Sequence, residues 1–267
     1  MKHDILEQQA LAGLPLECYV VDSHAHIGTG PSFPLYRNDV DSFIESMDRI
    51  GCDVCCISPY AGLKNYADIG LREIVAAVER YPDRIFGYIT ADVGYPESIE
   101  RQIKAGLAAG LTAMKIHVSS ARLPYSHPNY VKLFELANEH ALPILIHTWG
   151  AELPDLEPLF PRYPKITFVL GHAGSCQREK YAELALRYDN VCLELCFSAS
   201  PKGIVEYFVR RGLVDKMLWG SDANFYSCEH QIGRVVFADI DLADKYKILG
   251  RNAARLILKR EPPESYI

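Results

Sequence analysis

The chain has 267 residues, a formal net charge of −6 and 49% hydrophobic residues, a composition typical of a globular protein long enough to bury a core without disulfides. The acidic balance argues against a nucleic-acid-binding protein, which usually presents a basic face, and no apolar run is long enough to span a bilayer. Eight cysteines, several inside apolar runs, and an N-terminus without a signal-peptide pattern indicate reduced thiols in a cytoplasmic protein.

Apolar runs typical of buried strands alternate with segments of helical spacing. After a lead-in over residues 1–18, which contains a short helix or extended segment at 4–14, we expect strands at 19–23, 53–58, 84–90, 112–117, 143–147, 166–170, 191–196 and 217–221. Helices are expected at 40–50, 69–81, 98–109, 129–140, 176–188 and 202–211. Three prolines break or shorten the helix in 151–163, and 228–237 with 242–258 form an expected closing helix pair.

Strands that are apolar on both faces and alternate with helices imply a parallel sheet covered by helices. Eight such units favour an α/β fold of the (β/α)8 TIM-barrel type, in one domain over residues 1–267. An open doubly wound sheet would carry a glycine-rich phosphate turn after its first strand. Residues 28–31 do not make one, because no helix-like pattern follows them directly.

Two histidines follow the first apolar run. His24 and His26 share one face of a strand, so both imidazoles can reach one ion at about 2.0–2.1 Å, the usual Zn–N distance. The pair alone is a weak motif, and hydrogen-bonded core histidines are the alternative. Polar residues also end other expected strands, at the rim where such barrels carry their active sites; they are Lys115, His117, His147, His172 and Asp222.

These segments resemble the amidohydrolase superfamily, in the branch called amidohydrolase family 2, which includes metal-dependent hydrolases and nonoxidative decarboxylases. The similarity spans nearly the whole chain. It rests on residues 22–27 (DSHAHI), 114–117 (MKIH), 144–147 (ILIH), 163–174 (YPKITFVLGHAG), 218–222 (LWGSD) and 248–256 (ILGRNAARL).

The resemblance implies that four side chains bind one divalent cation: His24, His26, His147 and Asp222. It also implies that Asp222 and His172 are the catalytic residues. Three imidazoles and a carboxylate favour Zn²⁺, with Mn²⁺ or Fe²⁺ as alternatives. Asp222 would take a proton from an activated water and pass it to the leaving group, while His172 would orient the water or stabilise an oxyanion.

Two acidic residues are expected to support this site. Asp22 shares the face of the histidine pair, where it either holds a ligand histidine in one tautomer or makes a plain structural hydrogen bond. Glu194 lies between Cys192 and Cys196 on the seventh strand, and its buried charge needs a partner. We interpret the two thiols as small apolar core residues.

Lys115 ends the fourth strand, where a lysine in some superfamily branches is carbamylated and bridges two metals. The alternatives are binding of an anionic substrate or an ion pair. We expect a single metal, with Lys115 and His117 lining the site.

Further substrate contacts are expected from the loops that follow the strands. Aromatic rings with one or two arginines suit a small organic acid, whereas rings that merely cover the barrel or form a homodimer contact are the alternative. The candidates are Arg37, Arg122, Trp149 and Asn224, together with Phe33, Tyr36, Tyr60, Tyr125, His127, Phe225 and Tyr226.

We therefore expect a cytoplasmic, metal-dependent hydrolase that cleaves a C–N or C–O bond in a small amide, lactone or ester, with no nucleic-acid or membrane partner. The first alternative is a metal-dependent nonoxidative decarboxylase of a small aromatic or unsaturated acid, which would use the same metal ligands. The second is a catalytically inactive barrel that acts as a binding protein.

Overall fold

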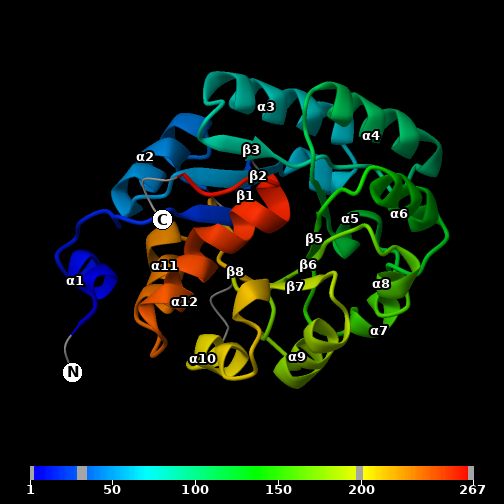
Figure 1. The fold of residues 1–267 in the computed structure, drawn as a ribbon. Coiled ribbons are helices and arrows are strands. Elements are labelled where there is room, and N and C mark those ends of the chain that lie inside the picture. Colours follow the sequence, from blue (N-terminus) through cyan, green and yellow to red (C-terminus); the bar gives the residue numbers. More distant parts are fainter. Residues whose placement is uncertain (1–2, 29–34, 197–200, 264–267) are drawn as a thin grey trace.

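Parallel strands form the centre of the molecule (Figure 1). The computed structural model describes residues 3–28, 35–196 and 201–263, and within them it has eight strands. These are β1 (Val21–Ile27), β2 (Val54–Pro59), β3 (Ile85–Gly87), β4 (Met114–Ile116), β5 (Ile144–His147), β6 (Phe168–Gly171), β7 (Val191–Glu194) and β8 (Met217–Leu218).

The strands close into a ring in sequence order. Continuous ladders join β1 to β3 and β4 to β8, and all of their pairings are parallel. Two isolated parallel bridges close the gaps, Ile89 with Met114 and Ala25 with Ala223. The barrel predicted from the alternating pattern is confirmed.

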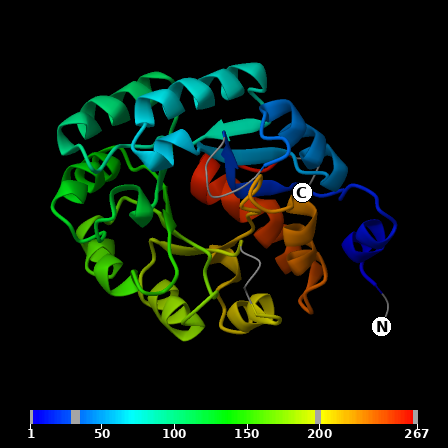
Figure 2. The same ribbon diagram turned by 180° about the vertical axis from the view of Figure 1, so that it is seen from behind.

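Helices surround this ring on the outside (Figures 1 and 2). The α-helices are α1 (Ile5–Leu11), α2 (Val40–Ile50), α3 (Ala67–Arg80), α4 (Ile99–Ala108), α5 (Val118–Ala121), α6 (Asn129–Glu139), α7 (Leu153–Leu156), α8 (Leu159–Arg162), α9 (Arg178–Arg187), α10 (Ile204–Val209), α11 (Cys228–Val236) and α12 (Leu242–Tyr246). The 3₁₀ segments are η1 (Ala61–Lys64), η2 (Pro96–Ser98) and η3 (Val214–Lys216); η4 (Lys247–Arg251) and η5 (Ala254–Leu258) are π-helical. No described helix is long and apolar enough to cross a membrane.

Local sequence signals explain where α2 begins and ends. The Asp39 side chain accepts a hydrogen bond from the Ser42 backbone N–H at 2.8 Å, so the first turn is capped. Gly51 ends the helix with φ 75°, a left-handed conformation that suits glycine at this position.

Several elements differ in length from the sequence-based expectation, and two of these differences are in β1 and the closing helix. β1 extends to Ile27, so His24 and His26 lie inside the strand, where Ala25 bridges the segment after β8. The expected closing helix 242–258 starts as α12 and continues as η4 and η5. Over most of its length its backbone hydrogen bonds therefore join residues five apart, as in a π-helix, rather than four apart.

Candidate active site

The interior of the barrel changes from apolar to polar along the strands. The layer nearer the amino-terminal ends of the strands is a buried apolar cluster that includes Ala113, Leu145, Val169, Cys192 and Leu218. Residues two positions further along a strand lie on the same face. These positions carry Lys115, His147, Gly171, Glu194 and Gly220, so the polar groups gather toward the carboxyl ends of the strands.

Three of the four expected metal ligands converge in this polar layer. The Asp222 Oδ1 atom lies 3.0 Å from His26 Nε2 and 3.6 Å from His24 Nε2. One donor atom from each of these three side chains lies within 4.8 Å of the others, and all three residues are buried. Neutral imidazoles and a carboxylate are suitable ligands for a divalent cation, so the residues present fit a metal ion.

The electrostatics of the group favour the ligand forms. Burial lowers the pKa of both His24 and His26, which keeps the imidazoles neutral. Burial alone would raise the pKa of Asp222, but the hydrogen bond to His26 and the nearby His24 hold that pKa below its usual value. Asp222 and His172 both have positive φ, 57° and 59°, so two non-glycine residues of this site hold a strained backbone.

The fourth expected ligand, His147, lies beside this group rather than within it. Its Nδ1 atom is 3.0 Å from His172 Nε2, and the Trp149 indole N–H donates a hydrogen bond to its Nε2 atom. The His117 ring stacks on His147 with centroids 3.7 Å apart. Burial lowers the pKa of His117 to about 2, so this ring is neutral as well.

A second buried cluster lies behind the histidines. Glu194 Oε2 is 2.8 Å from His24 Nδ1 and 3.1 Å from the Cys196 thiol. That thiol is also 3.1 Å from His24 Nδ1 and from His172 Nδ1. The interpretation of Cys196 as a merely apolar core residue is wrong, because its thiol contacts polar atoms of Glu194, His24 and His172. Cys192 does lie in the apolar layer.

Small residues make room for this packing. A Cβ atom on Gly220 would lie 2.4 Å from Glu194 Oε1 and 2.7 Å from His24 Cβ. A side chain at position 220 would therefore displace the carboxylate or the first histidine. The LWGSD motif supplies this clearance two residues before Asp222.

The Asp22 carboxylate is hydrogen-bonded to backbone N–H groups rather than to an imidazole. Its carboxylate accepts hydrogen bonds from the backbone N–H groups of His24, at 3.1 Å, and Ser221, at 3.0 Å, and from the Ser221 hydroxyl. Of the two roles considered for Asp22, this is the structural hydrogen bond. Glu194 is the residue whose carboxylate meets the His24 ring. Burial raises the pKa of Asp22 to about 7.

Lys115 is buried against the first histidine, with Nζ 2.6 Å from His24 Nε2. Burial lowers the pKa of its ammonium to about 8. It does not line the pocket described below. Its position next to the metal-ligand candidates therefore places it beneath the substrate space rather than in its wall.

A pocket of about 430 Å³ opens over the metal-ligand candidates. Nine of the expected residues line it: His26, Tyr60, His117, His147, Trp149, His172, Asp222, Phe225 and Tyr226. The remaining wall consists of Leu63, Lys64, Val118 and Glu152. Phe225 stacks on the His26 ring with centroids 4.7 Å apart.

Three residues expected in substrate binding lie elsewhere. Arg37 is exposed, pairs with Glu45 at 2.7 Å, and lines a separate hollow together with Asn224. Arg122 is exposed and lines neither space. Phe33 lies outside the described residues. Sequence reasoning missed Lys64 and Glu152, because the loop and helix that carry them have no signal for which way a side chain points.

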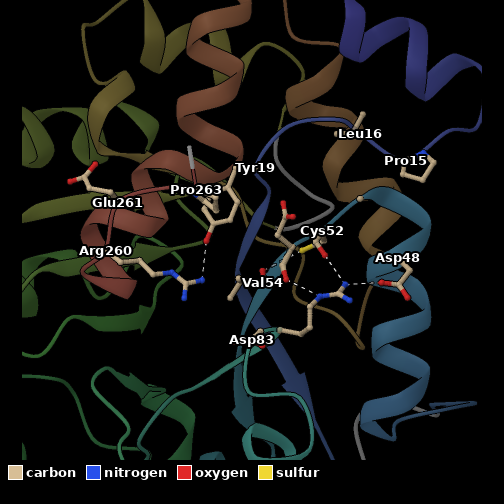
Figure 3. Close-up of a pocket in the computed structure, with 13 residues that line it drawn as sticks. Pro15, Leu16, Tyr19, Asp48, Cys52, Val54, Asp83, Arg260, Glu261 and Pro263 are labelled. Atoms are coloured by element: carbon tan, nitrogen blue, oxygen red, sulfur yellow. Dashed lines mark hydrogen bonds and ion pairs between the residues drawn. The ribbon is translucent and has the colours of Figure 1, made fainter. Parts of the chain in front are cut away.

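A larger hollow of about 720 Å³ lies at the opposite end of the barrel (Figure 3). It is formed by segments that precede β1, β2 and β3 and by the chain after η5. Its cations already have partners: Arg84 donates to Asp48 at 2.7 Å and to the Cys52 carbonyl at 2.9 Å, and Arg260 donates to the Tyr19 hydroxyl at 3.0 Å. This hollow is larger than the pocket over the metal-ligand candidates, but its two arginines are already hydrogen-bonded to protein oxygens.

Comparison with known proteins gives the family. The sequence model of the amidohydrolase family matches residues 21–257. No curated protein sequence matches the chain. Among solved structures, the chain is similar to 5-carboxyvanillate decarboxylase from Sphingomonas paucimobilis, with 16% identity, TM-score 0.73, and coverage of 91% of this chain and 99% of that one.

Two further solved structures have the same fold. A dihydroxybenzoic acid decarboxylase from Polaromonas sp., solved with manganese and the inhibitor 2-nitroresorcinol, has 16% identity and TM-score 0.73 over 90% of this chain and 96% of that one. The 2,6-dihydroxybenzoate decarboxylase from Rhizobium has 14% identity and TM-score 0.72 over 90% and 98%. At these identities the likeness establishes the fold.

These findings correct the expected reaction. A hydrolase was the main expectation from the sequence, whereas the three solved structures described above are decarboxylases. The ligand motifs are common to both reaction types, which is why the sequence alone did not separate them.

Proposed function

Because the chain belongs to the amidohydrolase family, we propose that it is a metal-dependent nonoxidative decarboxylase of a small aromatic or unsaturated acid. The observation that carries the proposal is the pocket of about 430 Å³ whose floor contains His26 and Asp222 and whose walls are largely aromatic. Such a space suits a planar ring with its carboxylate directed at the floor.

We assign the divalent cation to His24, His26 and Asp222, with His147 as the fourth ligand. When bound, the cation would hold the substrate's oxygens and neutralise negative charge that develops during the reaction. The solved decarboxylase from Polaromonas contains manganese, so Mn²⁺ is proposed alongside Zn²⁺. Ligation by His147 requires its Nε2 atom to exchange the Trp149 indole for the cation.

The pocket wall would orient the substrate. Tyr60 and Phe225 meet edge to face, with centroids 5.4 Å apart, and offer a surface against which a flat ring can pack. Lys64 lies 5.3 Å from the Tyr60 ring centre and contributes a cation to the same wall. A second anionic or hydroxyl oxygen on the substrate would bind Lys64, so we propose acids that carry such a group.

Decarboxylation replaces a C–C bond by a C–H bond, so the site must deliver one proton to carbon. The lowered pKa of Asp222 keeps its carboxylate ionised at rest, so Asp222 must first accept a proton from a substrate hydroxyl or water. It would then give that proton to the carbon that loses CO₂. His172 lines the same pocket, where its Nε2 atom would accept a hydrogen bond from water or a substrate hydroxyl and so orient it.

The test incubates metal-depleted protein, reconstituted with Mn²⁺ or Zn²⁺, with a panel of hydroxybenzoates and 5-carboxyvanillate, and measures CO₂ release and the product by mass spectrometry. We expect CO₂ and one decarboxylated product, with turnover restored only by metal. Metal-loaded protein that releases no CO₂ from any acid of the panel would contradict the proposal.

Lys64→Met sharpens the test of substrate orientation, because methionine keeps the length of the side chain without its charge. We expect KM for a hydroxylated acid to rise about tenfold, equivalent to about 1.4 kcal/mol, while kcat changes little. Lys202→Met is the matched control, since Lys202 lies outside the pocket. The cytoplasmic location and the homodimer stay predictions.

A further inference from the structure

We propose that the Glu194 carboxylate sets the tautomers of three active-site histidines through a chain of hydrogen bonds that all point toward it. The members of this relay are Glu194, Cys196, His24, His172 and His147. Glu194 and Cys196 have a positioning role in this relay, because the donors and acceptors along it allow only one direction for each hydrogen bond.

The relay begins at a group that can only accept. The Cys196 backbone N–H donates to Glu194 Oε1 at 2.5 Å, and the His172 backbone N–H donates to Oε2 at 3.3 Å. A backbone N–H can only donate, so both oxygens accept there. Burial raises the pKa of Glu194, but the hydrogen bonds from the Cys196 thiol and backbone N–H oppose that shift. We take the carboxyl group as ionised, so it has no proton of its own to donate. The two side-chain groups that face Oε2 must therefore donate: His24 Nδ1 at 2.8 Å and Cys196 Sγ at 3.1 Å.

The Cys196 thiol fixes the direction of the next hydrogen bond, which joins it to His172. It has a single proton, which it donates to Glu194, and the nearby His24 Nδ1, at 3.1 Å, is itself a donor to that carboxylate. Cys196 Sγ can therefore only accept from His172 Nδ1 at 3.1 Å. His172 therefore carries its proton on Nδ1 and has a bare lone pair on Nε2. His147 Nδ1, 3.0 Å from that atom, must then be the donor.

The far end of the relay gives the same answer independently. The Trp149 indole N–H is a donor only, and it faces His147 Nε2. His147 must accept there and donate from Nδ1, which is the tautomer that the Glu194 end requires. Trp149 is 40% exposed and Glu194 is fully buried, so the tautomers are set mainly from the Glu194 end of the relay.

All three histidines thus present an unprotonated Nε2 atom. For His24 this atom faces Asp222, at 3.6 Å, which is the ligand orientation that a cation needs. Lys115 donates to the same atom at 2.6 Å in the absence of a cation. This consequence rests on the proposed function, whereas the tautomers themselves do not.

The experiment reads the ring nitrogens directly. Metal-free protein labelled with ¹⁵N-histidine, without substrate, is examined by long-range ¹H–¹⁵N NMR, which distinguishes protonated from bare ring nitrogens. We expect His24, His147 and His172 to be Nδ1–H tautomers. A wild-type Nε2–H tautomer at any of the three would overturn the proposal, whatever the enzyme's activity.

Variants of Glu194 and Cys196 then test whether these residues set the tautomers. In Glu194→Gln the amide places an N–H group where an acceptor stood, so we expect His24 to switch to Nε2–H and metal affinity to fall about 10–100-fold in a chelator competition. In Cys196→Ala, His172 loses the acceptor at Nδ1 and becomes a mixture of tautomers, while His24 is unchanged. Cys196→Ser, which keeps a donor and acceptor, restores the single form.

The matched control is Cys192→Ala, because Cys192 is buried in β7, four residues before Cys196, but lies in the apolar layer. It should alter stability without moving any histidine signal. If Cys196→Ala and Cys192→Ala gave the same spectrum, or if Glu194→Gln left His24 unchanged, the relay would be refuted. If either variant failed to fold, the serine variant and the wild-type tautomers still decide.

Discussion

The two ends of the barrel are both hollowed and both carry charged residues, yet they use charge in opposite ways. At the amino-terminal end of the strands, Arg84 and Arg260 are held by carboxylate, carbonyl and hydroxyl oxygens of the protein itself. At the carboxyl-terminal end, His26 and Asp222 direct polar atoms at a shared point beneath the smaller pocket.

The difference teaches that the direction of polar atoms identifies a site better than the volume around it. The amino-terminal hollow is larger, about 720 Å³ against 430 Å³. Between the two ends lies the apolar layer that contains Val169 and Leu218, which separates structural ion pairs from the reactive groups. Substitutions at one end should therefore affect stability, and substitutions at the other should affect metal binding and turnover.

The largest contrast is expected between two aspartates. Asp222→Asn removes the carboxylate that would bind the cation and carry the proton, so kcat should fall about 10²–10⁴-fold. Asp53→Asn, at the other end, weakens the hydrogen bond that its Oδ2 accepts from the Val20 N–H, at a cost of about 1 kcal/mol in unfolding free energy. Turnover and denaturant unfolding are measured for both; equal effects on turnover would remove the contrast.

Two glycines provide the next contrast. Gly220→Ala forces a Cβ against Glu194 and His24, so we expect a loss of about 1–3 kcal/mol in unfolding free energy together with weaker metal binding. Gly233→Ala in α11 is the control, because its Cβ would meet only Phe237, at 3.8 Å, and alanine favours the helix by about 0.5–1 kcal/mol. Calorimetry in the presence and absence of Mn²⁺ checks both; a Gly220→Ala protein with unchanged metal affinity would contradict the packing argument.

Arg84→Met tests the amino-terminal end by itself. The guanidinium donates to the Asp53 carbonyl at 2.9 Å and to the Cys52 carbonyl at 2.9 Å, so its loss should lower the unfolding free energy by about 1–2 kcal/mol. Metal affinity and kcat should stay within twofold of wild type. A larger change in either would mean that the two ends are coupled through the apolar layer.

The smallest effect concerns thiols. Burial raises the pKa of Cys18 to about 12, whereas Cys176 is exposed. At pH 8 a thiol reagent should therefore label Cys176 alone among the eight cysteines. Above pH 9 the unfolded Cys18 thiol ionises while the folded one stays protonated, so the unfolded state binds fewer protons and unfolding free energy falls with rising pH.

Cys18→Ala should remove part of this alkaline loss, about 1 kcal/mol between pH 9 and 10. Denaturant unfolding at the two pH values measures it. Labelling of Cys18 as fast as Cys176 would show that the amino-terminal end opens readily.

Much of this arrangement could be predicted from the sequence because strand geometry is simple. The two-residue period placed His24 with His26 on one face and Glu194 on one face with Cys192, and the order of the strands brought Asp222 to the rim that carries the histidines. These are properties of regular elements, in which the direction of a side chain follows from its position.

The rest depended on contacts that no local pattern encodes. Cys196 meets His24 across 172 positions of sequence, so its polar role was invisible beside Cys192 on the same strand. Arg37 was expected in the pocket but pairs with Glu45 on α2, the helix that follows it. Lys64, at the end of η1, lines the pocket instead, because the segments after the strands have no regular pattern that fixes side-chain direction.

The most direct test of the account is a crystal soaked in Mn²⁺ and measured for anomalous scattering. The account predicts one strong peak within coordination distance, about 2.0–2.3 Å, of His24 Nε2, His26 Nε2 and Asp222, with His147 turned toward it. A peak at the amino-terminal hollow alone, or no peak between these side chains at saturating Mn²⁺, would contradict it.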